Sequence, residues 1–342
     1  MNTKILTTAV LAAFAATSAF AETYEITQWG ETIAPESSVA NPFYDCSSSQ
    51  NLNGNTYVIK VAGGTAESPL KLLDSNGTTY SQLIAGKGGY LEIDGHYIAS
   101  RLGTAVNLLI RDGSSLTITG SSGSGVNFWG GSASTVTIGE SANSSAKLIA
   151  VNSTMMFKND VVLNGELSST NTSYKSNKFS YMFNNVTFNA GAKMNSASGA
   201  GFTTFGPSDS VASNTVTINS GVAKGALSIA GVVNFADKTT VNFNASDAFS
   251  TDSNTQAKST FSLISYKHGN GTITADSQSA ADVVFNSTAN NSFGQIQFWE
   301  TSTLTLNLDT KSFMAFGEFT MHSDAAGACT IFVYNLSESS KT

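Results

Sequence analysis

The feature that most constrains the fold is a three-residue motif: a large apolar residue, a small polar one, and a second large apolar one. Because successive strand side chains point to opposite faces, the two apolar residues share one face and the polar residue points away from it. Glycine, asparagine and serine, which favour turns, separate the copies. The motif therefore predicts many short strands, each with one buried face. Residues 214–244 contain four copies, at Val216-Thr217-Ile218, Leu227-Ser228-Ile229, Val233-Asn234-Phe235 and Val241-Asn242-Phe243.

The motif also recurs outside this stretch. Loose self-similarity of this kind is typical of stacked repeats, in which no single unit can bury its apolar face alone. We therefore predict an all-β fold, a β-solenoid of stacked strands with irregular N-terminal and C-terminal caps. A β-sandwich is the alternative, because strands about ten residues apart also fit that architecture. The further copies begin at Leu116, Val126, Val136, Val186 and Leu304.

The chain divides into four parts. Residues 1–21 carry Lys4, an apolar stretch and an Ala19-Phe20-Ala21 site, which together predict a secretory signal peptide cut after Ala21. Residues 22–55 are irregular and are predicted to form an N-terminal capping segment. Residues 56–292 form the β-solenoid repeat region, and residues 293–342 form an aromatic-rich β segment, either a cap or the final strands of a sheet. We expect an exported protein, extracellular or on the cell surface, with the periplasm as an alternative.

Composition excludes some partners. Without Lys4 the chain has 16 basic and 24 acidic residues, and its two arginines are Arg101 and Arg111. An acidic chain without a basic cluster is a poor match for nucleic acid. No segment of the mature chain is apolar enough to cross a membrane as a helix. Cys46 and Cys329 are the two cysteines, and they would lie at opposite ends of a solenoid, whereas a sandwich could bring them together.

Three long polar inserts interrupt the motif, at residues 168–178, 196–213 and 246–258. They are rich in serine, threonine and asparagine, and their apolar content is too low to add to a core. We expect them to be surface loops. Loops on a rigid scaffold often carry binding sites, and the alternative is that these inserts are tolerated without a function.

The densest group of reactive side chains lies between Tyr90 and Asp112. Glu92, Asp94 and His96 alternate, so on one extended strand they would share a side, and Arg101 and Arg111 follow. One hypothesis is an acid-base or lyase site, because paired carboxylates hydrolyse glycosides. The alternative is a plain solvated strand face, and Gly95 could separate the three side chains. No motif for a cofactor or a metal site is present, so we expect neither.

Several pieces of the sequence resemble the passenger regions of bacterial autotransporter-like and adhesin-like surface proteins, over approximately residues 57–308. Such passengers are usually right-handed parallel β-helices that act as adhesins, scaffolds or sometimes enzymes, although this sequence lacks their C-terminal translocation barrel. The matching pieces are SLTITG (115–120), STVTIG (134–139), NVTFN (185–189), NTVTIN (214–219) and TTVNFN (239–243).

The resemblance implies a structural or adhesive surface protein that presents loops rich in serine, threonine and asparagine. Its partner would be a glycan or a surface protein of a host or neighbouring cell. The alternatives are a carbohydrate-active β-helix enzyme, either a polysaccharide lyase or a glycoside hydrolase, and a compact β-sandwich binding module. We favour the non-enzymatic role, because no catalytic motif accompanies the candidate residues.

Overall fold

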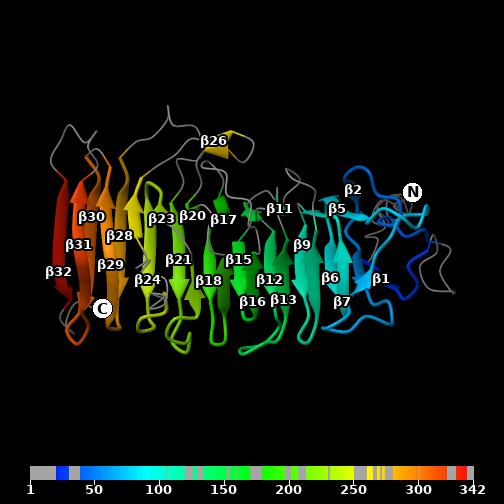
Figure 1. The fold of residues 1–342 in the computed structure, drawn as a ribbon, viewed down its shortest axis with the longest axis horizontal. Helices are drawn as coiled ribbons and strands as arrows, with labels where there is room; N and C mark the ends of the chain where they lie inside the picture. The colour runs from blue at the N-terminus through cyan, green and yellow to red at the C-terminus, as the bar shows by residue number, and fades with distance from the viewer. Residues whose placement is uncertain are drawn as a thin grey trace, which may run out of the picture.

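The computed structural model describes the chain from residue 21 to residue 336 with internal gaps. The described residues contain strands and no helix, arranged as a coil that advances along one axis (Figure 1). The predicted signal peptide lies outside the described residues, apart from Ala21. The described ranges are 21–30, 39–104, 106–119, 126–128, 134–151, 155–158, 160–169, 179–196, 202–206, 213–229, 232–249, 260–264, 268–269, 272–273, 280–299, 301–321 and 329–336.

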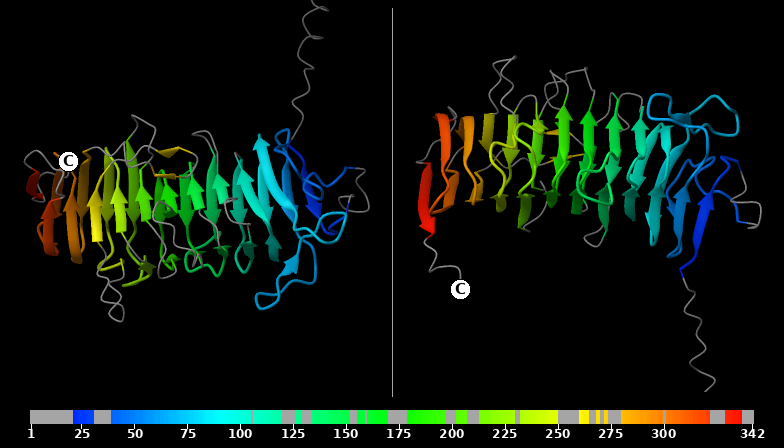
Figure 2. Two further views of the ribbon diagram at one scale, coloured as in Figure 1. Left: turned by 45° about the horizontal axis from the view of Figure 1, so that its top comes forward. Right: turned by 90° about the horizontal axis from the view of Figure 1, so that it is seen from below.

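Three parallel sheets form the sides of the coil, and Figure 2 shows their strands stacked side by side along its axis. The 12-stranded sheet contains β1 (Thr23–Ile26), β3 (Thr56–Ile59), β6 (Tyr90–Ile93), β9 (Asn107–Ile110), β12 (Thr135–Ile138), β15 (Asp160–Leu163), β18 (Val186–Phe188), β21 (Asn214–Ile218), β24 (Thr239–Phe243), β28 (Asp282–Ser287), β30 (Thr303–Asp309) and β32 (Thr330–Leu336).

The 11-stranded sheet contains β2 (Gln50–Asn51), β5 (Gln82–Lys87), β8 (Arg101–Thr104), β11 (Val126–Phe128), β14 (Met155–Phe157), β17 (Phe179–Phe183), β20 (Phe202–Phe205), β23 (Val232–Phe235), β25 (Thr260–Leu263), β29 (Asn291–Phe298) and β31 (Met314–Met321). The 7-stranded sheet contains β4 (Leu70–Lys71), β7 (His96–Ala99), β10 (Ser115–Ile118), β13 (Lys147–Ala150), β16 (Glu166–Ser169), β19 (Lys193–Ser196) and β22 (Leu227–Ser228). A short antiparallel pair, β26 (His268–Gly269) with β27 (Thr272–Ile273), lies apart from them.

Each copy of the motif forms one side of a turn of the coil. The copies at Leu116, Val126 and Val136 lie in β10, β11 and β12, on three different sheets. The next turn adds strands in parallel, so that Val136 pairs with Leu108 on one side and Val161 on the other. The predicted β-solenoid is confirmed, and the sandwich alternative is not the fold, because sandwich sheets are antiparallel. Eleven strand spacings make the 12-stranded sheet roughly 50 Å long.

The apolar residues of the motif fill the interior. On the 11-stranded sheet four phenylalanines stack on consecutive strands, and their ring centroids are 5.1, 5.5 and 5.6 Å apart. Parallel offset rings at this spacing attract one another beyond the effect of burial. We call Phe157, Phe183, Phe205 and Phe235 the phenylalanine column; all four are fully buried.

Two sequence expectations need correction. The insert at residues 196–213 contains β20, and its Phe205 belongs to the phenylalanine column. Phe249, within the insert at 246–258, is also buried. The expectation that these inserts add nothing to the core was therefore wrong, because a single aromatic residue can fill a stacking position inside a polar stretch. The remaining insert residues 170–178, 197–201, 207–212 and 250–258 lie outside the described residues.

The polar residue of the motif does not always reach solvent. On the 11-stranded sheet Thr204, Asn234 and Ser262 lie on neighbouring strands, opposite to the core face, and all three are buried. A second, smaller apolar cluster of Met156, Met182 and Ile264 covers part of the same face. The outer face of this sheet is therefore not the polar exterior that the motif predicts.

The two ends of the coil differ. At the first turn Trp29 donates a hydrogen bond from Nε1 to the carbonyl of Leu73, at 2.9 Å, and Phe43 is fully buried against Tyr57. The last turns, from β28 to β32, alternate between the 12- and 11-stranded sheets only. Cys46 and Cys329 do not form a disulfide, and they lie near the first and last strands respectively.

Candidate functional site

Three of the five candidate residues from the sequence meet on the outer face of the 12-stranded sheet. Glu92 lies in β6, Asp94 directly follows that strand, and Arg111 directly follows β9. Arg111 donates to Glu92 Oε2 from Nε at 3.0 Å and from Nη2 at 2.5 Å, and to Asp94 Oδ2 from Nη1 at 3.3 Å. The hydrogen bond to Glu92 raises the pKa of Arg111.

This cluster continues as an ion-pair network. Lys60 Nζ lies 3.8 Å from Asp94 Oδ2 and 3.5 Å from Glu25 Oε1. The positive and negative charges therefore alternate across four adjacent strands of the sheet. Oppositely charged side chains that pair across neighbouring strands in this way stabilise an outer sheet face.

The other two candidate residues lie elsewhere. Gly95, with φ of 138°, turns the chain out of the 12-stranded sheet, so His96 begins β7 in the 7-stranded sheet, where its Nδ1 lies 2.9 Å from Ser115 Oγ. Arg101 begins β8 in the 11-stranded sheet, and its Nε is buried without a hydrogen-bond partner among the described residues. The five side chains therefore do not form one site.

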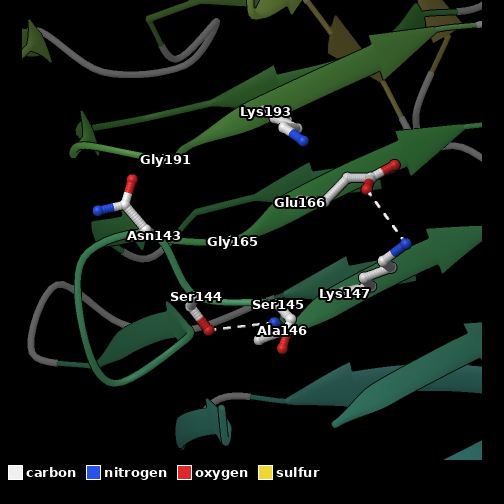
Figure 3. A pocket seen from close by; sticks show the side chains of 9 residues that line it. All are labelled: Asn143, Ser144, Ser145, Ala146, Lys147, Gly165, Glu166, Gly191 and Lys193. Atoms are coloured by element: carbon white, nitrogen blue, oxygen red, sulfur yellow. Dashed lines mark hydrogen bonds and ion pairs between the residues drawn. The ribbon is translucent and has the colours of Figure 1, made fainter. Parts of the chain in front are cut away.

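A shallow groove lies instead on the 7-stranded sheet, with a volume of roughly 360 Å³. It is bounded by the turn at residues 143–146 and by the first residues of β13, β16 and β19, as Figure 3 shows. Two ammonium groups, one carboxylate, serine hydroxyls and glycine backbone surround it. The lining residues are Asn143, Ser144, Ser145, Ala146, Lys147, Gly165, Glu166, Gly191 and Lys193.

Unequal turn lengths create this groove. The chain passes from β15 to β16 through Asn164 and Gly165 alone, whereas residues 139–146 connect β12 to β13. The longer turn extends past its neighbour: Ser144 N donates to Asn164 O at 3.1 Å, and Asn143 N donates to Ala190 O at 2.7 Å. It therefore overhangs the starts of the next two strands of the sheet.

Close packing holds the overhanging turn in place. Asn143 has a φ of 61°, and a β-carbon added to Gly191 would lie 2.3 Å from the α-carbon of Asn143. Gly191 is thus required by the close approach of the two backbones. On the other side of the turn, the Ser141 and Ser144 hydroxyls both donate to Asp112. These hydrogen bonds lower the pKa of Asp112 to about 2.

The charges of the groove form a row across three strands. Lys147, Glu166 and Lys193 are register partners in β13, β16 and β19. Glu166 Oε2 forms an ion pair with Lys147 Nζ at 3.5 Å, and Glu166 Oε1 accepts a hydrogen bond from Asn195 Nδ2 at 3.1 Å, so both carboxylate oxygens are engaged. No ion pair engages Lys193 among the described residues. The row therefore has one net positive charge, and it can bind an anionic or strongly polar group.

Sequence reasoning missed the groove. The signal was present, because each residue of the row directly precedes a buried apolar residue, Leu148, Leu167 or Met194. Which of these residues lie next to one another depends on the number of residues in each turn of the coil, however, and this number varies. Without the register, three charged residues 19 and 27 positions apart in the sequence cannot be recognised as a row.

Comparisons with known proteins add no assignment: no family model, no curated protein and no solved structure matches this chain. Within the described residues there is no group of three or more histidine, cysteine, aspartate and glutamate side chains that could hold a metal ion. The same part of the chain contains no helix of the length and apolarity needed to cross a membrane.

Proposed function

We propose that the protein is an exported structural or adhesive element that binds a polar partner on the outer face of its 7-stranded sheet. The supporting observation is the groove, in which a cationic row lies on consecutive hydrogen-bonded strands under a fixed turn. Such a surface needs no rearrangement to bind, which lowers the entropic cost of association. The likeness of the sequence to adhesin-like passenger regions agrees with this role.

The chain connectivity supports the same face. One stretch of each polar insert follows a position on the 7-stranded sheet and precedes a strand of the 11-stranded sheet. Residues 170–178 lie between β16 and β17 in the sequence, residues 197–201 lie between β19 and β20, and residues 250–258 lie between Phe249, which forms a parallel bridge with Leu227, and β25. These three stretches thus begin where the chain leaves the 7-stranded sheet. A partner on the 7-stranded sheet would meet both the groove and the residues that start these inserts.

The partner that fits best is a glycan with carboxylate or sulfate groups. Lysine ammonium groups bind such anions, and serine hydroxyls and backbone groups can pair with sugar hydroxyls. A second candidate function, a carbohydrate-active enzyme, has in its favour the meeting of Glu92, Asp94 and Arg111. Because Arg111 engages both carboxylates, we expect no turnover of polysaccharides by the purified protein.

The test is binding of the purified protein to immobilised neutral, carboxylated and sulfated glycans. We expect binding to the acidic glycans, and we expect Lys193→Ala to weaken it by fivefold or more because this lysine is the unpaired cation of the groove. Lys311→Ala, which removes an exposed lysine from the turn before β31, should leave binding unchanged. Equal losses in the two variants, or no binding to any glycan class, would overturn the proposal.

A further inference from the structure

The last two strands, β31 and β32, are edge strands of the described coil. β32 ends the 12-stranded sheet and β31 ends the 11-stranded sheet, and both lie at the end of the coil opposite β1 (Figure 1). An edge strand presents free backbone N–H and C=O groups that can pair with another strand. The two edges lie at one end of the molecule, and together they form a surface as long as one strand.

The core also opens at this end. Ile331 and Val333 are register partners of the buried Leu304 and Leu306, and Phe319 is the partner of the buried Ile296. These three residues continue the inner rows of the solenoid, yet they are 41, 62 and 53% exposed. They occupy core positions that no further turn of the described coil covers.

Residues 322–328 and 337–342 lie outside the described residues, and they contain no leucine, isoleucine, valine, methionine, phenylalanine, tyrosine or tryptophan. At the other end of the coil, by contrast, the inner-row residue Ile26 of β1 and the neighbouring Leu52 are fully buried. The open apolar surface is therefore specific to the end that carries β31 and β32.

We propose that this end binds a second copy of itself, so that the protein forms an end-to-end dimer with two-fold symmetry. From β28 onward the strands alternate between two sheets, so β31 lies half a turn before β32. A two-fold axis that places β32 of each copy next to β31 of the partner closes both sheets at once. In each copy β32 extends half a turn beyond β31, and this step at the end of one copy fits the same step of the other. The strands that pair across the contact run antiparallel.

Charge and symmetry favour this occupant. β31 and β32 carry one charged residue between them, Glu318 in β31. The proposed pairing places this strand against β32, which is uncharged, so no like charges meet across the strands. A two-fold contact uses the same surface on both copies and therefore closes at two copies, whereas a head-to-tail contact would extend into a filament.

The experiment measures the mass of the purified protein by sedimentation over a concentration series. We expect a dimer, and we expect small-angle scattering to give a particle about twice as long as one coil. Val333→Lys and Phe319→Lys, one on each edge, should each weaken the dimer at least tenfold, because each puts an ammonium group into the joined core. Both positions are exposed in the single copy, so circular dichroism should show an unchanged β fold.

Tyr90→Lys is the matched control, since Tyr90 is a large apolar residue of similar exposure, 49%, away from β31 and β32. It should leave the dimer unchanged. A protein that stays monomeric at 100-fold dilution and at its highest soluble concentration alike overturns the proposal. So does growth beyond two copies, or a dimer that Tyr90→Lys weakens as much as Val333→Lys does.

Discussion

Two columns of stacked side chains follow the axis of the coil, and they stabilise it in different ways. The phenylalanine column is fully buried and lies on the inner face of the 11-stranded sheet. The second column, Asn164, Asn189 and Asn219, lies directly after three consecutive strands of the 12-stranded sheet, and we call it the asparagine ladder. Asn189 Nδ2 donates to Asn164 Oδ1 at 2.8 Å, and Asn219 Nδ2 donates to Asn189 Oδ1 at 2.7 Å.

The difference lies in what each column specifies. Stacked rings gain free energy from burial and tolerate small lateral shifts. An amide ladder needs donor and acceptor at matching heights, so it fixes which residue stands above which. The ladder also ends on the backbone, where Asn164 Nδ2 donates to Gly139 O at 2.7 Å. We therefore expect the phenylalanine column to contribute more to the free energy of folding than the ladder does, and the ladder to fix the register.

The largest expected effect is that of Phe183→Ala, which removes a ring that stacks on both Phe157 and Phe205. The loss of buried surface and the cavity that remains should cost about 3–5 kcal/mol. The midpoint of urea unfolding, followed by circular dichroism, measures this loss. Phe313→Ala, at a half-exposed position, is the control and should change stability by less than about 0.5 kcal/mol. If Phe183→Ala and Phe313→Ala lowered the stability equally, the phenylalanine column would contribute no more to stability than an exposed ring does.

A smaller effect is expected from Asn189→Ala, in the middle of the asparagine ladder. The substitution removes two hydrogen bonds and leaves Asn164 Oδ1 and the Asn219 amide without these partners. Since Asn164 is buried, the cost should be about 1–3 kcal/mol. The exposed Asn335, on β32, provides the control substitution Asn335→Ala in the same unfolding measurement. If Asn189→Ala cost as much as Phe183→Ala, the proposed division of roles between the columns would be wrong.

The two columns also show what a sequence can predict. The apolar-polar-apolar motif predicted the strands of residues 214–244, because burial of one strand face imposes period two. It could not predict the stacking partners, because the length of one turn varies. Tyr90 pairs with Asn107, 17 residues later, whereas Phe243 pairs with Ser287, 44 residues later. Phe205 was missed for this reason, since its stacking partners lie in strands before and after long polar stretches.

The candidate site shows the same limit. Alternation placed Glu92, Asp94 and His96 on one face, but a single glycine with positive φ moved His96 to another sheet. Arg111 was 17 residues from Asp94 in sequence, and the stacking of β9 on β6 brought it within hydrogen-bond distance. The local pattern therefore predicts on which face of its own strand a side chain lies. Which residues meet across strands depends on the turns, and the spacing of a degenerate repeat does not give their lengths.

The smallest expected effect concerns Asp112, which holds the groove turn and belongs to neither column. Its pKa is about 2 in the folded protein, because the Ser141 and Ser144 hydroxyls donate to the carboxylate, against an ordinary value of 3.8. A lowered pKa means that the carboxylate stabilises the fold fully above pH 3.8 and that this stabilisation is lost as the pH falls towards 2. Because Asp112 is exposed, solvent screening should keep the contribution below about 1 kcal/mol.

Unfolding midpoints between pH 2 and pH 6 test this expectation, with Asp112→Asn beside the unchanged protein. At pH 6 the unfolding midpoint of the unchanged protein should be higher than that of Asp112→Asn. This difference between the two midpoints should disappear as the pH falls through that window. Glu67→Gln removes an exposed negative charge elsewhere and serves as the control for the change in net charge. If the difference between the two unfolding midpoints were constant with pH, the Asp112 carboxylate would not be what holds the turn. The overhang would then depend on its backbone bonds to Asn164 and Ala190, and the groove would keep its shape in acid.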